Sequence, residues 1–143
     1  MPEPSSAIIP LAGGCQCGAV RYTVRAAPQS LYHCHCQMCR KVHGAMFATF
    51  AVVPVAGLVI AKGADQLSTF ESSPGTLRLF CRGCGCQLFC TIASQPENIF
   101  FTPTTLDDGV HPGHRPEIER HVYVGSKVPW YEIESRLPQH DTY

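Results

Sequence analysis

The chain has 143 residues, which is enough for one domain with its own core but too few for two ordinary domains. Its 11 Lys and Arg residues balance 11 Asp and Glu residues, so it offers no broad positive surface to a phosphate backbone. Nucleic acid is therefore excluded as an expected partner. The apolar stretches are too short and too interrupted to span a bilayer, so no membrane partner is expected either.

The first ten residues are rich in proline and serine, which predicts a flexible N-terminal tail over residues 1–10. They contain neither the basic segment nor the sustained apolar segment of a secretory signal, which favours a cytoplasmic location. No repeat or linker divides the rest of the chain. Residues 11–143 are therefore predicted to form a single domain.

Most of the chain is predicted to form short β-strands. In residues 19–24 apolar and polar side chains alternate with the period of a half-buried strand. A short helix is predicted over residues 37–43, and a helical turn near 104–107. Apolar runs of strand length follow at residues 45–53, 58–61, 76–80, 87–92, 99–102 and 121–124. Turn residues separate these runs at intervals of about ten residues, which favours a mainly antiparallel β architecture.

Nine cysteines are the most unusual feature of the composition. An odd count without an export signal argues against a disulfide framework, because cytosolic reductants keep thiols reduced. In Cys15-Gln16-Cys17 and in Cys34-His35-Cys36 the two sulfurs are also too close along the chain to bridge each other without strain. Metal binding is the better explanation.

Two pairs of cysteines can supply one closed metal site. Cys15 and Cys17 come from an early loop, whereas Cys81 and Cys84 form a C-x-x-C pair in a late loop. Zinc accepts four thiolates in a tetrahedral arrangement and lowers the thiol pKa enough to deprotonate them. This site is expected to be structural, with folding coupled to metal binding.

A second group, Cys34, Cys36 and Cys39, offers three sulfurs from one loop and leaves a fourth position to be filled. An open fourth position is the pattern of a catalytic zinc. Three thiolates leave one excess negative charge on Zn²⁺, so strong hydroxide chemistry is not expected, whereas a soft thiol substrate would bind well as a thiolate. The alternative is a closed structural site, completed by Cys86, His33 or His35.

Four motifs in order resemble those of the glutathione-dependent formaldehyde-activating enzyme family: G-G-C-x-C-G-A-V-R-Y at 13–22, C-H-C-x-x-C-R at 34–40, F-C-x-x-C-G at 80–85 and K-x-x-W at 127–130. The resemblance covers residues 11–138. It implies a mainly β, β-tent-like fold of small antiparallel sheets packed at an angle and stabilised by zinc. It also implies two zinc ions per chain, a structural one on Cys15, Cys17, Cys81 and Cys84 and a catalytic one on Cys34, Cys36 and Cys39.

The activity that the resemblance implies is joining of formaldehyde to glutathione, the synthesis of S-(hydroxymethyl)glutathione. In the reverse sense this is a carbon–sulfur lyase reaction. The leading hypothesis is accordingly a zinc-dependent lyase acting on a small thiol and a small aldehyde. The competing hypothesis is a non-catalytic binding module with two structural zinc sites.

One position departs from the family pattern, because Cys86 stands where a small or hydroxyl residue is common after F-C-x-x-C-G. It could close the second zinc site or act as a labile ligand. Cys90, inside an apolar run, is expected to be a core residue without a ligand role. Trp130 is expected to be a packing anchor. Four other residues are noted without a firm role: Arg40 and Lys41, which could meet carboxylates of glutathione, and His111 and His114 in a Pro- and Gly-rich loop.

Overall fold

The computed structural model describes residues 10–143, so all of the predicted tail except Pro10 lies outside the described residues. The described chain is mainly β, with 40% strand and 19% helix, as the sequence predicted. Its strands form one sheet of three strands and one of seven. Among the described residues, no helix is both long and apolar enough to cross a membrane.

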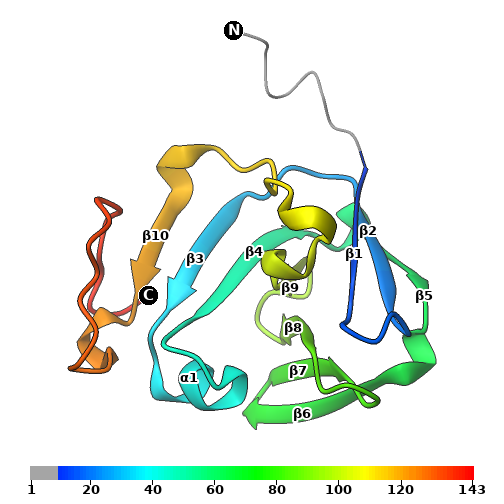
Figure 1. Cartoon of the computed structure of the whole chain (residues 1–143), viewed down its shortest axis with the longest axis horizontal. Coiled ribbons are helices and arrows are strands. Elements are labelled where there is room, and N and C mark those ends of the chain that lie inside the picture. The colour runs from blue at the N-terminus through cyan, green and yellow to red at the C-terminus, as the bar shows by residue number, and fades with distance from the viewer. Residues whose placement is uncertain (1–9) are drawn as a thin grey trace, which may run out of the picture.

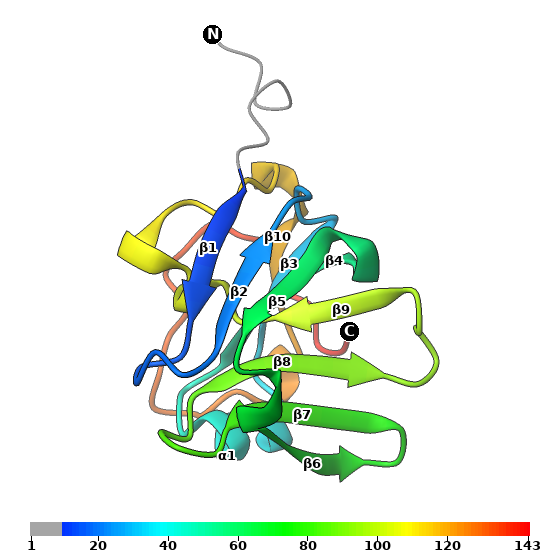
Figure 2. The same cartoon turned by 90° about the vertical axis from the view of Figure 1, so that its right-hand side faces the viewer.

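The small sheet is antiparallel and has the order β1-β2-β5. Its strands are β1 (Leu11–Gly14), β2 (Arg21–Val24) and β5 (Leu58–Lys62). In Figures 1 and 2 it covers one side of the larger sheet, and the views show strands of the two sheets running at an angle to each other. This is the angled packing of small sheets that the resemblance implies.

The large sheet has the order β10-β3-β4-β9-β8-β7-β6. Its strands are β3 (Ser30–Cys34), β4 (Ala48–Pro54), β6 (Leu67–Ser73), β7 (Thr76–Cys81), β8 (Gln87–Ile92), β9 (Asn98–Phe101) and β10 (Glu119–Val122). All neighbours in this sheet pair antiparallel except β10 and β3, which are parallel. The C-terminal segment lies along the free edge of β10, where His121 bridges Gln139.

The helical elements are short. Helix α1 (Gln37–His43) follows β3 and ends at Gly44, which adopts a left-handed conformation. Single 3₁₀ turns occupy most of the longer connections: Val55–Gly57, Ala64–Gln66, Pro103–Thr105, Asp107–Gly109, Pro116–Ile118 and Val124–Ser126. The predicted helix over 37–43 is thus confirmed, and the turn predicted near 104–107 corresponds to two successive 3₁₀ turns.

Each predicted strand overlaps an observed one, but β1, β3 and β6 were not predicted. β1 contains two glycines and β6 is mostly polar and partly exposed, so neither shows the alternation on which the prediction relied. In β3 the consecutive residues Leu31 and Tyr32 are both buried, one on each face of the large sheet. A strand covered on both faces cannot be recognised from alternation.

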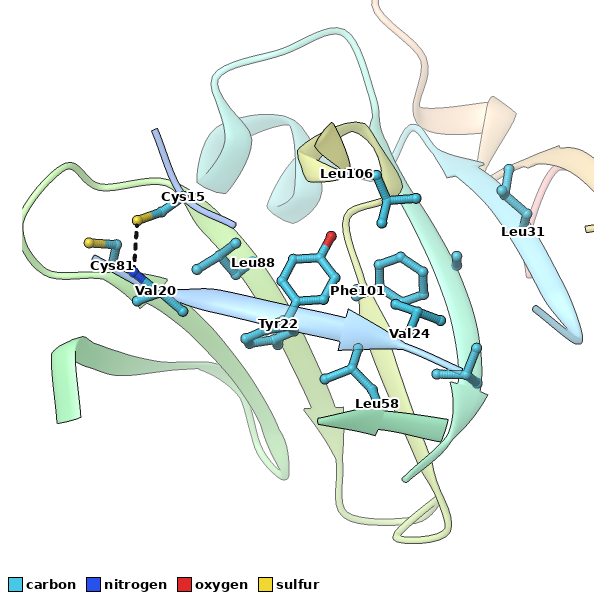
Figure 3. Close-up of a cluster of buried hydrophobic side chains, with 13 residues drawn as sticks. Cys15, Val20, Tyr22, Val24, Leu31, Leu58, Cys81, Leu88, Phe101 and Leu106 are labelled. Atoms are coloured by element: carbon cyan, nitrogen blue, oxygen red, sulfur yellow. Dashed lines mark hydrogen bonds between the residues drawn. The ribbon is translucent and has the colours of Figure 1, made fainter. Parts of the chain in front are cut away.

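The large sheet carries a hydrophobic core on each face. In β4, Ala51 and Val53 belong to the core under the small sheet, whereas Phe50 and Val52 belong to the other core. Successive side chains of a strand point to opposite faces, which explains this division. In the core under the small sheet, the ring of Tyr22 meets the rings of Phe89 and Phe101 edge to face. Tyr22 and Phe101 are labelled in Figure 3.

Candidate metal centres

The first cysteine group lies where the two sheets meet. Cys15 and Cys17 follow β1, while Cys81 ends β7 and Cys84 follows it. The four sulfurs all lie within 4.8 Å of one another. The Sγ atom of Cys17 is 3.6 Å from that of Cys15 and 3.7 Å from that of Cys81.

These separations fit a metal ion. Four thiolates at the usual zinc–sulfur distance around a tetrahedral ion stand about 3.8 Å apart, whereas a disulfide brings two sulfurs to about 2 Å. All nine cysteines are free thiols. The arrangement of the first group is therefore that of a four-thiolate site rather than of a disulfide.

Backbone hydrogen bonds hold the first group in place. The N–H of Val20 donates to the Sγ of Cys15 at 3.3 Å (Figure 3), and the N–H of Gly85 donates to the carbonyl of Cys81 at 2.7 Å. Backbone N–H groups of Cys17 and Cys86 lower the pKa of Cys84 to about 6. Such donors stabilise thiolate charge, which a metal-binding sulfur needs.

The second group lies at the start of α1. Cys34 ends β3, Cys36 is the N-cap of α1, and Cys39 lies in its first turn, with all three sulfurs within 4.8 Å of one another. The N–H of Cys39 donates to the Sγ of Cys36 at 3.3 Å. Hydrogen bonds from the thiols of Cys34 and Cys39 lower the pKa of Cys36 to about 2. Three sulfurs that lie this close together can bind one divalent metal ion.

The two groups belong to different cores. Cys15 and Cys81 are part of the core under the small sheet, whereas Cys34 and Cys39 are part of the core on the opposite face of the large sheet. Cys34 and Cys39 are only 4% and 5% exposed, so a metal held there would be almost completely shielded by protein on the sulfur side.

A cavity of about 430 Å³ lies against the C-terminal end of α1, the helix that carries Cys39 in its first turn, and the cysteines of the second group are not among its lining residues. It is also lined by the start of β4, by the loop after Cys84 and by the 3₁₀ turn Pro103–Thr105. Its wall is polar and, among the described residues, contains no lysine, arginine or carboxylate. The lining residues include His43, Phe47, Thr49, Cys86, Thr102 and Thr105.

This chain matches a family model over residues 10–126, that of the glutathione-dependent formaldehyde-activating enzyme. It belongs to that family. A relative from Halomonas elongata, named "Putative glutathione-dependent formaldehyde-activating enzyme", is 31% identical over 133 residues, which cover 88% of this chain and 82% of the relative. A crystal structure of a Rhodobacter sphaeroides protein is similar at 28% identity with a TM-score of 0.60, and the match covers 71% of this chain and 92% of that one.

The fourth position of the second group is not filled by the residues that the sequence offered for it. In the part of the chain from residue 10 onward, the group contains its three cysteines and no other Cys, His, Asp or Glu. The side chain of Cys86 packs in the core that holds Cys15 and Cys81, and it lines the cavity.

Both histidines are engaged with other residues. His33 hydrogen-bonds Thr49 through Nδ1 and Glu119 through Nε2, each at 2.8 Å. The Nε2 atom of His35 is 2.8 Å from the Nδ1 atom of His121. In this structure neither ring belongs to the second group.

The structure also places the other residues for which the sequence suggested a role. Arg40 donates to the carbonyl of His35 at 3.2 Å, whereas Lys41 is exposed. Cys90 is buried in the core beside Cys39 and belongs to neither sulfur group, and burial raises its pKa to about 11. The expectation for Trp130 is wrong, because this side chain is 72% exposed. The Lys127 ammonium nearby is bound to the carbonyls of Val128 and Tyr131.

Two features of this region were missed in the sequence. One is the histidine network, in which His114 and His33 share the carboxylate of Glu119, with His111 stacked on His114. Its members are scattered along the chain, so no local pattern joins them.

The other missed feature is Arg78, which contacts the second group. A charged residue inside the apolar run T-L-R-L-F was a visible signal, because a buried charge needs a partner.

Proposed function

We propose that the protein is a zinc-dependent carbon–sulfur lyase of the S-(hydroxymethyl)glutathione synthase type. It would act on glutathione or a similar small thiol and on formaldehyde or a similar small aldehyde. One zinc ion would be held by Cys15, Cys17, Cys81 and Cys84, and a second by Cys34, Cys36 and Cys39. Membership of the family supports the substrates, and the cytoplasmic location remains an expectation.

The second group carries this proposal, because three convergent sulfurs leave one place on a tetrahedral ion for a substrate. Zinc bound there would supply Lewis acidity and favour the thiolate form of a bound thiol. The protein's own contribution is the burial of Cys34 and Cys39, which keeps water away from the sulfur side of the site.

The proposed reaction balances without an oxidant or reductant. The thiol sulfur forms a bond to the carbonyl carbon, the carbonyl π bond breaks, and the thiol proton ends on the new hydroxyl. The cavity beside α1, which Thr49, Thr102 and Thr105 help to line, can accept the substrates.

The proposal is tested by exchange NMR on the zinc-loaded protein with glutathione and formaldehyde at equilibrium. We expect the exchange between free glutathione and S-(hydroxymethyl)glutathione to accelerate in proportion to protein concentration. The same measurement with the Cys36→Ser variant should return to the uncatalysed rate. Equal exchange rates with and without the wild-type protein would exclude this activity.

The binding-module hypothesis makes a different prediction for the second ion. X-ray absorption on a sample with zinc in the second group alone, made with Cys17→Ser and Cys84→Ser together, would then give four protein ligands, either four sulfurs with Cys86 or three sulfurs and one nitrogen with His33 or His35, and glutathione would leave them unchanged. The lyase proposal predicts three sulfurs and one lighter ligand in the absence of thiol. Addition of glutathione should then raise the count to four.

A further inference from the structure

A buried arginine lies beside the second cysteine group. Arg78 is in β7 and is 5% exposed. Its Nη2 donates to the Sγ of Cys39 at 3.5 Å, and its Nε donates to the hydroxyl of Ser72 at 2.9 Å. The guanidinium also lies over the ring of Phe50, with its central carbon 5.8 Å from the ring centroid.

This arginine has no carboxylate partner within residues 10–143, where the ion pairs involve other side chains. A guanidinium stays protonated in proteins, and burial of an unpaired charge is strongly unfavourable. The nearest group able to carry the compensating charge is therefore the sulfur of Cys39.

The surroundings supply no competing charge. His43 lies close enough to be affected by Arg78, and burial together with that arginine lowers its pKa to about 4, so its ring is neutral at pH 7. Cys90 stands opposite Arg78 in the β7–β8 register, but it belongs to neither sulfur group. Among residues 10–143, the second group is therefore the one left to balance the guanidinium.

We propose that Arg78 is a positioning residue that serves as the fixed counter-charge of the metal centre on Cys34, Cys36 and Cys39. Three thiolates around a divalent ion leave one excess negative charge in a buried place, and the guanidinium supplies one positive charge next to it. The inference rests on metal binding by this group, which is part of the proposed function, and it does not depend on the reaction.

The test compares two substitutions at the same position. Arg78→Gln keeps an N–H donor but removes the charge, whereas Arg78→Lys keeps the charge on a different donor. Arg25→Met removes an arginine charge at an exposed position and is the matched control. Each purified protein is loaded with zinc, and release of the two ions to a chromogenic chelator is followed.

We expect Arg78→Gln to lower zinc affinity at the second group by about 10- to 100-fold, the range typical of residues that support metal ligands. The ion on Cys15, Cys17, Cys81 and Cys84 should be retained as in the wild type, which provides an internal reference. Arg78→Lys and Arg25→Met should stay close to the wild type. A folded Arg78→Gln protein with wild-type affinity at the second group would overturn the proposal.

A spectroscopic measurement separates the charge from a general loss of packing. With cobalt in the second group, the sulfur-to-metal charge-transfer band should move to longer wavelength in Arg78→Gln, because the thiolates lose a neighbouring positive charge. The band should stay in place in Arg78→Lys. An unchanged band in Arg78→Gln would contradict the proposal.

If Arg78→Gln does not fold, the zinc affinity of Arg78→Lys alone tests the counter-charge role. Zinc affinity close to that of the wild type supports the counter-charge role, and a loss as large as that expected for Arg78→Gln contradicts it. The outcome is distinct from a failure of the proposed activity. A protein that binds two zinc ions but does not accelerate the exchange would remove the lyase proposal and leave the role of Arg78 standing.

Discussion

At the scale of single residues, the three sulfurs of the second group act as a unit, because a zinc site with two ligands binds far more weakly than one with three. We predict that Cys36→Ser reduces the zinc content from two ions per chain to one and abolishes thiol–formaldehyde exchange. The fold should persist, because Cys36 is only partly buried and ends no strand. Elemental analysis, native mass spectrometry and circular dichroism check these three outcomes.

The control for this prediction is Cys90→Ala, which removes a buried sulfur from the same core but outside the group. It should keep two zinc ions per chain. If Cys36→Ser also keeps two ions, the assignment of this group is wrong.

A second residue-scale prediction concerns His121, which is 4% exposed. Burial, together with His33 and His35, lowers its pKa to about 4, and the nearby Glu119 opposes this effect. The unfolded chain binds this proton below pH about 6.5, whereas the folded chain binds it only near pH 4. Between these values the unfolded state binds more protons, so the His121 contribution to stability is complete above pH about 6.5 and decreases as the pH falls toward 4.

We therefore expect the free energy of unfolding of the wild type to fall relative to His121→Asn by on the order of 1–3 kcal/mol over this range. Asn can preserve a polar atom near the position of Nδ1, which contacts His35, but it does not titrate. Urea unfolding of both proteins at fixed zinc concentration, from pH 7.5 to 4, measures the difference. A difference that does not change with pH would contradict this prediction.

The sequence indicates which cysteines converge better than it indicates their surroundings. Cys15 with Cys17 and Cys81 with Cys84 are visible as pairs because both members of each pair come from one turn. Partners such as Arg78 for Cys39 meet only after the strands pair, so spacing along the chain contains no trace of them. Trp130 was misjudged for a related reason, since its apolar character says nothing about whether another element covers it.

At the scale of elements, Gly63 controls how β5 leads into the next 3₁₀ turn. It has a φ of +80°, and a Cβ at this position would lie 1.9 Å from the carbonyl oxygen of Ala19. We predict that Gly63→Ala destabilises the protein by roughly 3 kcal/mol or more, because strain in the left-handed conformation adds to a clash with backbone. Thermal and urea unfolding of the zinc-loaded variant measure this loss.

Gly113→Ala is the matched control, because Gly113 also has positive φ, at +91°, but has open space around its Cβ position. It should cost only the conformational strain, on the order of 1 kcal/mol. Equal losses in the two variants would show that the close approach to Ala19 does not contribute.

Helices and strands were predicted correctly where residues close in sequence determine them. They were missed where pairing with a distant strand determines them. The bounds of α1 were predicted correctly. The C-x-x-C turn of Cys36 and Cys39 leads into this helix, and Gly44 ends it. β6 forms because β7 offers it a partner along Leu67–Ser73, although its own sequence has little strand character. The parallel pairing of β10 with β3 joins residues 88 positions apart, which no short-range pattern can indicate.

At the scale of the whole molecule, the two cysteine groups differ in what they connect. The first joins the turn after β1 in the small sheet to the end of β7 in the large sheet, with 64 positions between Cys17 and Cys81. The second lies within one continuous segment, from the end of β3 into α1. Metal at the first group closes a long loop and should stabilise the packing of the two sheets, whereas metal at the second orders a local segment.

This difference predicts separate responses to loss of each ion. The double variant Cys17→Ser/Cys84→Ser, which leaves only two sulfurs in the first group, should lower the melting temperature by several degrees more than Cys36→Ser and increase amide exchange throughout β1 and β2, because the small sheet loses its link to β7. In Cys36→Ser the increased exchange should stay within residues 34–43. Hydrogen–deuterium exchange with mass spectrometry, at equal zinc concentration, distinguishes these patterns. Equal exchange in β1 and β2 of the two variants would mean that the buried contacts of Tyr22 with Phe89 and Phe101, rather than the metal, hold the sheets together.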